Sequence, residues 1–182
     1  MNEKIFESFP VLKTEHLILR RMEEKDIQGL YNFYSDPQSL KYIARNLLTD
    51  IDQAVEKLKI FDQLFINKIG IWWAFNKKGE EKFIGFGGFF EVDKEANKAE
   101  IGYGFLPGNW GKGYGTEAVK ILTEFGLKEL QLHKIYANVD PENKASVRLL
   151  ENFGYKREGL FKDHDYAQNK YFDTAVYTVI NK

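Results

Sequence analysis

A glycine-rich stretch between a predicted strand and a predicted helix constrains this chain more than any other feature. It reads LPGNWGKGYGTE from Leu106 to Glu117, with glycine at positions 111, 113 and 115. The residues before it are typical of a strand, and the amphipathic run after it is typical of a helix. Glycine permits positive φ and close approach of a ligand, and the first turn of a helix has N–H groups without partners. The stretch therefore predicts a site for phosphate or pyrophosphate, with an ordinary strand–helix turn as the alternative.

Two well-known phosphate loops do not fit this stretch. A P-loop requires Ser or Thr after Gly-Lys, whereas Lys112 is followed by Gly113. The dinucleotide fingerprint requires the spacing G-x-G-x-x-G and an acidic residue about 20 positions on, at the end of the next strand. Here the spacing is G-x-G-x-G, and the next predicted strand ends in Asn138-Val139-Asp140. Neither mononucleotide nor dinucleotide binding of these types is indicated.

Composition narrows the class of protein further. The 182 residues fit one domain, over 1–182, and the absence of cysteine excludes disulfides, thiolate-bound zinc and a thiol nucleophile. The 26 basic and 27 acidic residues are intermixed, which argues against nucleic acid as the main partner. No apolar run reaches the roughly 18 residues of a membrane span, and residues 1–8 lack the pattern of a signal peptide. We therefore expect a cytoplasmic protein without a membrane partner.

Hydrophobic periodicity predicts the element order βαα-βββ-αβ-αββ. The predicted strands cover 16–22, 70–76, 83–92, 99–105, 134–139, 155–161 and 172–180, and the predicted helices cover 23–35, 51–65, 116–129 and 144–152. The three strands from 70 to 105 are typical of an antiparallel meander, whereas a strand–helix–strand unit after it requires a parallel pairing. The predicted fold class is α+β, with a mixed, mostly antiparallel sheet of about six to seven strands and about four helices.

The run Gly111-Lys112-Gly113-Tyr114-Gly115-Thr116-Glu117-Ala118 resembles the acetyl-CoA signature of the Gcn5-related N-acetyltransferases (GNAT). Trp110 before the run, together with Thr116-Glu117-Ala118 at its end, resembles the RimJ/RimL-type ribosomal-protein N-acetyltransferases within that superfamily. The general motif has Gln or Arg where Trp110 stands. Many relatives carry a tyrosine acid on the last helix where this chain has Leu150. The match covers nearly the whole chain, so a GNAT-like fold is expected.

The resemblance implies that the strands at 99–105 and 134–139 splay apart and that the pantetheine arm of acetyl-CoA lies between them. Gly102, Gly104, Pro107 and Gly108 supply a reason, since they weaken strand pairing. Free amides near Phe105 and Leu106 would then bind the arm and polarise the thioester carbonyl.

The other coenzyme contacts implied by the resemblance lie in two segments. The pyrophosphate would be held by the amides of Gly111, Lys112, Gly113, Tyr114, Gly115 and Thr116. Asn143 and Ser146 match the Asn-x-x-Ser of the family and would also touch the coenzyme. Asn143 is equally well suited to be a helix N-cap.

Two residues are catalytic candidates. Glu100, at the start of the strand that ends at the thioester, is the candidate base, with a surface carboxylate as the alternative. Because the tyrosine acid is absent, Ser146 or water must protonate the leaving thiolate. Glu117 is predicted to be structural, bonding at the first turn of its helix. The histidines are isolated, and the triplet Asp163-His164-Asp165 is interpreted as a solvated loop, so no metal site is expected.

The predicted activity is direct transfer of acetyl from acetyl-CoA to a primary amine. The resemblance favours the N-terminal α-amino group of a protein, and a polyamine or another small amine is the alternative. An α-amino group has a pKa of about 7.7–8.0 and needs less help from a base than a lysine-like amine at about 10.4. The acceptor pocket is expected near Trp72 or Trp73, Tyr166 and Tyr171, unless these only pack. A coenzyme A-binding sensor without turnover and a homodimer are both left open.

Overall fold

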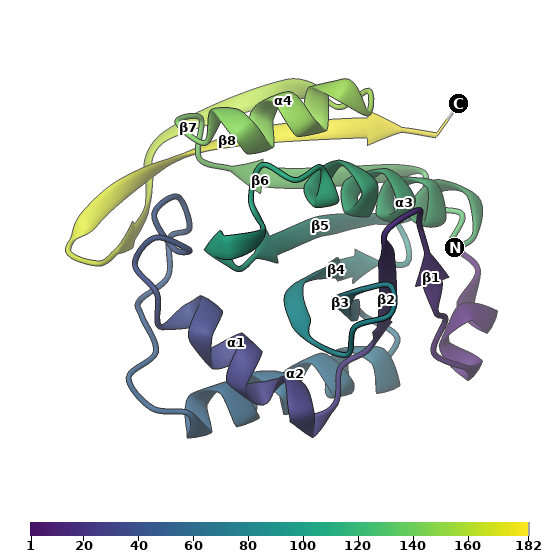
Figure 1. Cartoon of the computed structure of the whole chain (residues 1–182). Helices are drawn as coiled ribbons and strands as arrows, with labels where there is room; N and C mark the ends of the chain where they lie inside the picture. The colour runs from purple at the N-terminus through teal and green to yellow at the C-terminus, as the bar shows by residue number, and fades with distance from the viewer. Residues whose placement is uncertain (182) are drawn as a thin grey trace.

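One mixed β-sheet organises the computed structural model, which describes residues 1–181 (Figure 1). Its strands are β1 (Leu12–Lys13), β2 (Leu17–Arg21), β3 (Ile71–Lys77), β4 (Phe83–Asp93), β5 (Lys98–Phe105), β6 (Lys134–Val139), β7 (Lys156–Ala167) and β8 (Lys170–Ile180). The helices are α1 (Ile27–Tyr34), α2 (Asp52–Ile66), α3 (Tyr114–Lys128) and α4 (Lys144–Asn152), with 3-10 turns at Glu3–Glu7, Glu24–Asp26 and Pro107–Asn109.

The strand order is β1-β2-β3-β4-β5-β6-β8-β7, and within residues 1–181 only β5 and β6 pair in parallel. This confirms the predicted α+β class and mixed sheet. The sheet has eight strands because the two-residue β1, too short to leave a periodic signal, adds an edge.

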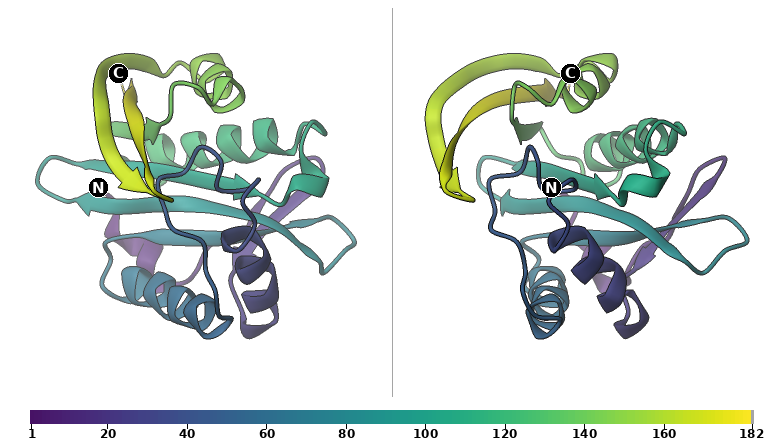
Figure 2. Two further views of the ribbon diagram at one scale, coloured as in Figure 1. Left: turned by 90° about the vertical axis from the view of Figure 1, so that its left-hand side faces the viewer. Right: turned by 60° about the vertical axis from the view of Figure 1, so that its left-hand side comes forward.

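Helices cover both faces of the sheet (Figure 2). α1 and α2 lie on one face and bury a cluster that includes Leu30, Leu58 and Phe86. α3 lies on the other face, over a larger cluster that includes Trp73 and Leu122, with α4 beside it. Alternation along each strand sends successive side chains to opposite clusters, so the sheet is apolar on both faces.

β5 and β6 separate after a short pairing. The parallel register covers Lys98↔Lys134, Ala99↔Ile135 and Glu100↔Tyr136, and then ends. β6 nevertheless remains paired with β8 as far as Val139↔Ala175. The predicted splay is therefore present from the residue after Glu100 onward.

Two glycines of β5 also have a packing role that the sequence did not indicate. A Cβ on Gly104 would lie 2.5 Å from the ring of Phe33, and one on Gly102 would lie 2.9 Å from the ring of Trp72. These glycines therefore let aromatic rings close onto the strand, which no side chain larger than hydrogen would allow.

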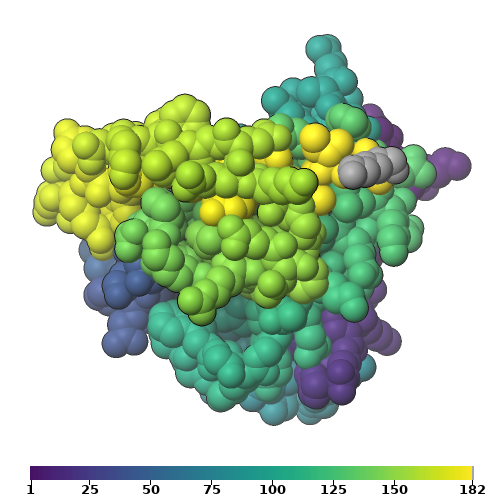
Figure 3. Space-filling model, turned by 90° about the horizontal axis from the view of Figure 1, so that it is seen from above, coloured from purple at the N-terminus to yellow at the C-terminus, as the bar shows by residue number. Residues whose placement is uncertain are grey.

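The last two strands form a longer hairpin than expected. The segment 162–170, predicted to be a loop, continues β7 to Ala167 and turns into β8 at Lys170. Positive φ at Gln168 (51°) and Asn169 (58°) gives the tight two-residue turn of a β-hairpin. The triplet around His164 thus lies in a strand, not a loop. Asp163 and His164 are exposed, whereas Asp165 is half-buried and accepts from the Thr174 hydroxyl at 2.7 Å. Figure 3 shows the hairpin tip beside the segment that joins α1 to α2.

Candidate active site

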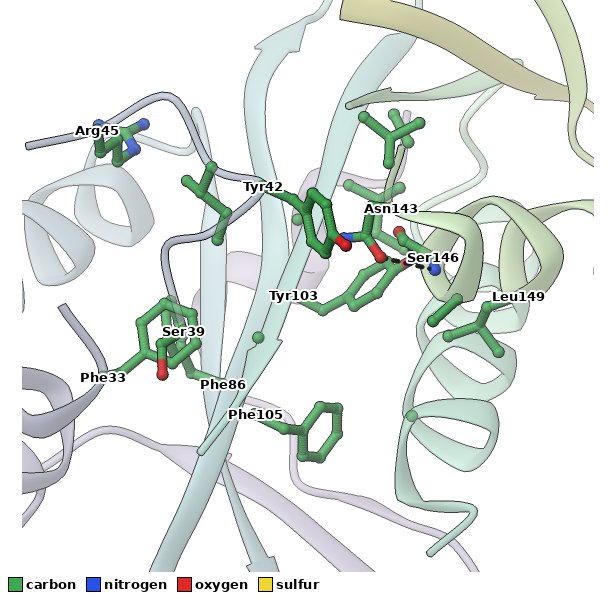
Figure 4. A pocket seen from close by; sticks show the side chains of 18 of the residues that line it. Phe33, Ser39, Tyr42, Arg45, Phe86, Tyr103, Phe105, Asn143, Ser146 and Leu149 are labelled. Atoms are coloured by element: carbon green, nitrogen blue, oxygen red, sulfur yellow. Dashed lines mark hydrogen bonds between the residues drawn. The ribbon is translucent and has the colours of Figure 1, made fainter. Parts of the chain in front are cut away.

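A cleft of about 1030 Å³ passes through the splay between β5 and β6 (Figure 4). One part is lined by the glycine-rich loop and the start of α4, and the other by the α1–α2 segment, α2 and the central strands. Side chains from both faces of β5 border it, including Glu100 on one face and Tyr103 and Phe105 on the other. The splay thus connects the two sides of the sheet, which a continuous β5–β6 pairing would separate.

The glycine-rich loop presents consecutive unpaired amides. The first bond inside α3 runs from the amide of Glu117 to the carbonyl of Gly113, at 3.2 Å. Within the described chain, no amide from Gly111 to Thr116 has a hydrogen-bond acceptor. Gly111 and Gly113 have φ of +71° and +84°, and a Cβ at either would meet no atom within 4 Å. Open space beside unpaired N–H groups at a helix N-terminus is the geometry of an anion site.

Lys112 lies in this loop but does not line the cleft. Its ammonium donates to the carbonyl of Gly108 at 2.7 Å and so closes the loop on itself. The helix begins at Tyr114, two residues earlier than predicted, so the amides of Tyr114 and Gly115 belong to its first turn.

The end of β5 differs from the prediction at one residue. The amide of Leu106 donates to the carbonyl of Ile84 at 2.9 Å, so the prediction of a free amide at Leu106 is wrong. Because alternate residues of an antiparallel strand face opposite sides, the Phe105 amide points away from β4, toward the splay. The Phe105 amide is therefore available there.

Trp110 compensates for the lost strand pairing. Its indole N–H donates to the carbonyl of Phe105 at 2.7 Å, which the splay leaves without a strand partner. A tryptophan at this position thus supplies a hydrogen-bond donor where the general motif has a polar side chain.

Asn143 and Ser146 lie together at the start of α4. The Asn143 side-chain oxygen accepts from the Ser146 amide at 3.1 Å, so Asn143 is the helix N-cap. The hydroxyl of Ser146 lies 2.7 Å from that of Tyr103 (Figure 4). Sequence reasoning missed Tyr103. Alternation along β5 indicates only that Tyr103 and Glu100 face opposite sides of the sheet, and no local pattern places Tyr103 beside Ser146. Burial raises the pKa of Tyr103 to about 12, so its hydroxyl stays protonated at neutral pH.

Glu100 is a cleft residue, not a surface carboxylate, with 8% of its surface exposed. Burial, reinforced by the charge of Glu91, raises its pKa to about 7. The side-chain amide of Asn138 donates to its carboxylate at 3.1 Å and, together with the charge of Arg45, opposes the rise in pKa. A carboxylate that titrates near neutrality is suited to accept a proton from an amine.

Glu117 is structural, as predicted, but its partners lie far away in sequence. Its carboxylate accepts from the His16 amide at 3.0 Å, from His16 Nδ1 at 2.6 Å and from the Thr14 hydroxyl. These bonds fix the N-terminal end of α3 to the turn between β1 and β2. They also hold the glycine-rich loop in place.

The predicted acceptor-pocket aromatics separate into two groups. Trp72 lines the cleft, whereas Trp73 is fully buried in the core and donates to the Pro10 carbonyl at 2.7 Å. Tyr166 and Tyr171 are exposed and pack on each other with ring centroids 5.0 Å apart, outside the cleft.

Residues 1–181 contain no group of three or more His, Cys, Asp or Glu side chains that could hold a metal ion. No helix in the same range is long and apolar enough to cross a membrane.

Comparison with known proteins gives concordant matches. The acetyltransferase (GNAT) domain family matches residues 16–156. The uncharacterized N-acetyltransferase p20 of Bacillus licheniformis is 34% identical over 171 residues, which are 94% of this chain and 96% of the relative. The crystal structure of a GNAT-family acetyltransferase from Bacillus anthracis superposes with a TM-score of 0.82 at 29% identity, over 94% of this chain and 99% of the other. The fold, the loop geometry and these matches together show that the chain belongs to the GNAT family of N-acetyltransferases.

Proposed function

We propose that this enzyme transfers the acetyl group of acetyl-CoA directly to the N-terminal α-amino group of a protein. The observation that carries the proposal is the continuous cleft, which joins the unpaired amides at 111–116 to the carboxylate of Glu100 through the splay. An anion site at one end and a base at the other are the two requirements of a ternary complex for amine acetylation.

The residues divide the reaction between them. The amides from Gly111 to Thr116 hold the pyrophosphate, and Asn143 and Ser146 border the coenzyme beside them. Phe105 donates its amide to the thioester oxygen and stabilises the negative charge that forms on it when the amine nitrogen attacks the carbonyl carbon. Glu100 accepts the proton that the amine gives up.

Ser146 completes the transfer as the carbon–sulfur bond breaks. Its hydroxyl gives a proton to the thiolate, and Tyr103, 2.7 Å away, passes its own proton to the serine oxygen. The amide product, the thiol of coenzyme A and a protonated Glu100 result, and loss of the proton from Glu100 to solvent balances reprotonation of Tyr103. No cysteine is available to carry an acetyl intermediate, in keeping with direct transfer.

The pKa of Glu100 supports an α-amino acceptor. Its value of about 7 lies close to the roughly 7.7–8.0 of a protein N-terminus and far from the roughly 10.4 of an alkylamine. Two more distant relatives in Escherichia coli differ in acceptor. One, 25% identical, is named for the alanine of ribosomal protein uS5, and the other, 23% identical, for spermidine. A polyamine or small amine is therefore the second candidate.

Thiol release from acetyl-CoA, measured over a panel of amines, tests the proposal. The panel contains peptides that begin with Ser, Ala or Met, the same peptides with blocked N-termini, and spermidine. We expect release with the free peptides and none with the blocked ones. Release with spermidine alone would assign the enzyme to the small-amine group, and no release with any amine would count against the proposed function.

Ser146→Ala and Tyr103→Phe are expected to lower kcat about 10-fold or more at saturating acetyl-CoA, because both remove a group from the proton relay. The double variant should lose little more than the worse single variant, since residues that act as one unit are not additive. Single-turnover kinetics gives the rates, and additive losses would contradict the relay. Asn138→Ala is the control, because Asn138 lies on β6, lines the cleft and takes no part in the relay. In the double variant Asn138→Ala/Ser146→Ala, the two losses of rate, expressed as free energies, should add.

A further inference from the structure

The acceptor side of the cleft is rich in positive charge. The charged side chains that line the whole cleft are Lys41, Arg45, Lys57 and Glu100. The three cations come from the α1–α2 segment and from α2, whereas the unpaired amides belong to the loop before α3. Figure 4 shows Arg45 on the opposite side of the cleft from Asn143 and Ser146. The three cations therefore line the part of the cleft formed by the α1–α2 segment and α2, where the proposed function places the acceptor.

These cations have no carboxylate partners. In the described part of the chain, no salt bridge includes Lys41, Arg45 or Lys57. Lys57 is half-buried, with its ammonium 4.2 Å from the centre of the Tyr34 ring. Burial, and then the charge of Arg45, lower the pKa of Lys57. Arg45 is exposed, and its charge acts on the Glu100 carboxylate without forming a salt bridge with it. A bound anion would offset the repulsion between Arg45 and Lys57.

The loop that carries Arg45 is fixed by the distant hairpin. Gln168, at the β7–β8 turn, donates from its side chain to the carbonyl of Arg45 at 3.0 Å and to that of Leu40 at 3.2 Å. Its backbone amide donates to the side chain of Asn46 at 2.9 Å. The backbone at Arg45 is therefore held against the cleft, although its side chain has no protein partner.

An aromatic wall separates the cations from the core. Trp72 stacks on Phe61 and on Phe90, with ring centroids 4.9 and 5.5 Å apart and interplanar angles of 25° and 28°. Ile60 lies at the rim with 54% of its surface exposed. Apolar surface of this kind binds the uncharged part of a ligand.

We infer that the acceptor is a primary amine that carries a carboxylate, which pairs with Arg45 and Lys57 while the amine reaches Glu100. The inference rests on the proposed acetyl transfer and names the class of amine that it uses. An acidic peptide N-terminus and a free amino acid with an apolar side chain share this chemistry. A polyamine does not, because its additional positive charges would be repelled by the same cations.

Matched acceptors test the inference. They are a peptide beginning Ala-Asp-Glu, its neutral counterpart beginning Ala-Asn-Gln, free phenylalanine, phenylalanine amide and spermidine. At low salt and saturating acetyl-CoA, we expect kcat/KM to be about 10-fold or more higher for at least one carboxylate-bearing member than for its neutral counterpart, as a charge-assisted hydrogen bond provides. A preference within the peptide pair would indicate an acidic peptide N-terminus as the acceptor, and a preference within the phenylalanine pair would indicate a free amino acid.

The variant Arg45→Gln/Lys57→Gln should remove this preference through KM, with acetyl-CoA affinity retained. Because the charge of Arg45 also lowers the pKa of Glu100, kcat is compared at a pH well above 7, where Glu100 is ionised in both proteins and kcat should be retained. Lys59→Gln is the control, since Lys59 lies on the same helix but pairs with Glu56 at 2.7 Å and does not line the cleft. Equal rates for charged and neutral acceptors, a better rate with spermidine, or weaker acetyl-CoA binding by the double variant would each overturn the inference. In each of these three outcomes the enzyme still releases thiol from acetyl-CoA with some amine. Failure of the proposed function would instead appear as no release with any amine.

Discussion

Gly113→Val is expected to abolish acetyl-CoA binding while the protein remains folded. The residue has φ of +84°, and its missing Cβ leaves the space beside the unpaired amides open. A valine would place a branched side chain in that space and would disfavour the backbone conformation that directs the amides. We expect the dissociation constant to rise by more than about 100-fold, which corresponds to losing about 3 kcal/mol of binding free energy. Calorimetric titration with acetyl-CoA measures it.

Gly154→Val is the matched control for this experiment. Gly154 ends α4 with the same φ of +84° and equally open space, but it does not line the cleft. Each variant incurs a backbone cost of about 1–2 kcal/mol, which is small beside a typical stability of about 5–15 kcal/mol. Thermal unfolding should show similar losses for both, with coenzyme affinity lost only at Gly113. Unchanged affinity in Gly113→Val would show that the pyrophosphate lies elsewhere.

Glu100→Gln is expected to reduce kcat about 100-fold or more at unchanged acetyl-CoA affinity, because the amide cannot accept the proton of the amine. Steady-state rates at saturating acetyl-CoA, with affinity measured by titration, separate the two effects. Equal rates in wild type and variant would show that water or the acceptor itself performs this step.

The pH dependence follows from the raised pKa of Glu100. With a value of about 7, the carboxyl group is protonated below neutrality, so the rate should decline as pH falls through that value. Glu91→Gln removes a charge that raises this pKa, and should move the decline to lower pH. Arg45 and Asn138 lower the pKa of Glu100. Glu91 is therefore the neighbour whose neutralisation should shift the decline to lower pH. A pH profile of kcat/KM for wild type and Glu91→Gln measures the displacement.

The same residue links pH to stability. Since the folded pKa is raised from 4.5 to about 7, the contribution of Glu100 is fully present below pH 4.5 and is lost as pH rises through about 7. The difference corresponds to about 3 kcal/mol. Glu100→Gln should therefore gain stability relative to wild type at pH 8 but not at pH 4, as measured by denaturant unfolding. Equal differences at both pH values would contradict the burial of this charge.

Features that depend on residues close together in the chain could be predicted from the sequence. The order of elements follows from hydrophobic periods of 2 and 3.6, and the bounds of β6 and α4 agree with the structure at both ends. The glycine-rich loop could be predicted because its backbone takes positive φ at positions 111 and 113. Few residues other than glycine adopt positive φ, so the conformation leaves a pattern in the sequence. Asn143 was recognisable as a cap for a similar reason, since the bond that it makes spans only three residues.

The groups that meet in the cleft come from distant parts of the chain, so their contacts depend on the packing of the whole fold. Tyr103 and Ser146 are 43 positions apart, and Arg45 is held by Gln168, 123 positions away. Whether the Leu106 amide was free depended on its register with β4, and whether Glu100 was buried depended on the packing around the splay. Local patterns fix which face of an element a side chain occupies. The hydrogen bonds and burial that give the side chain its chemistry depend on the elements packed against that face.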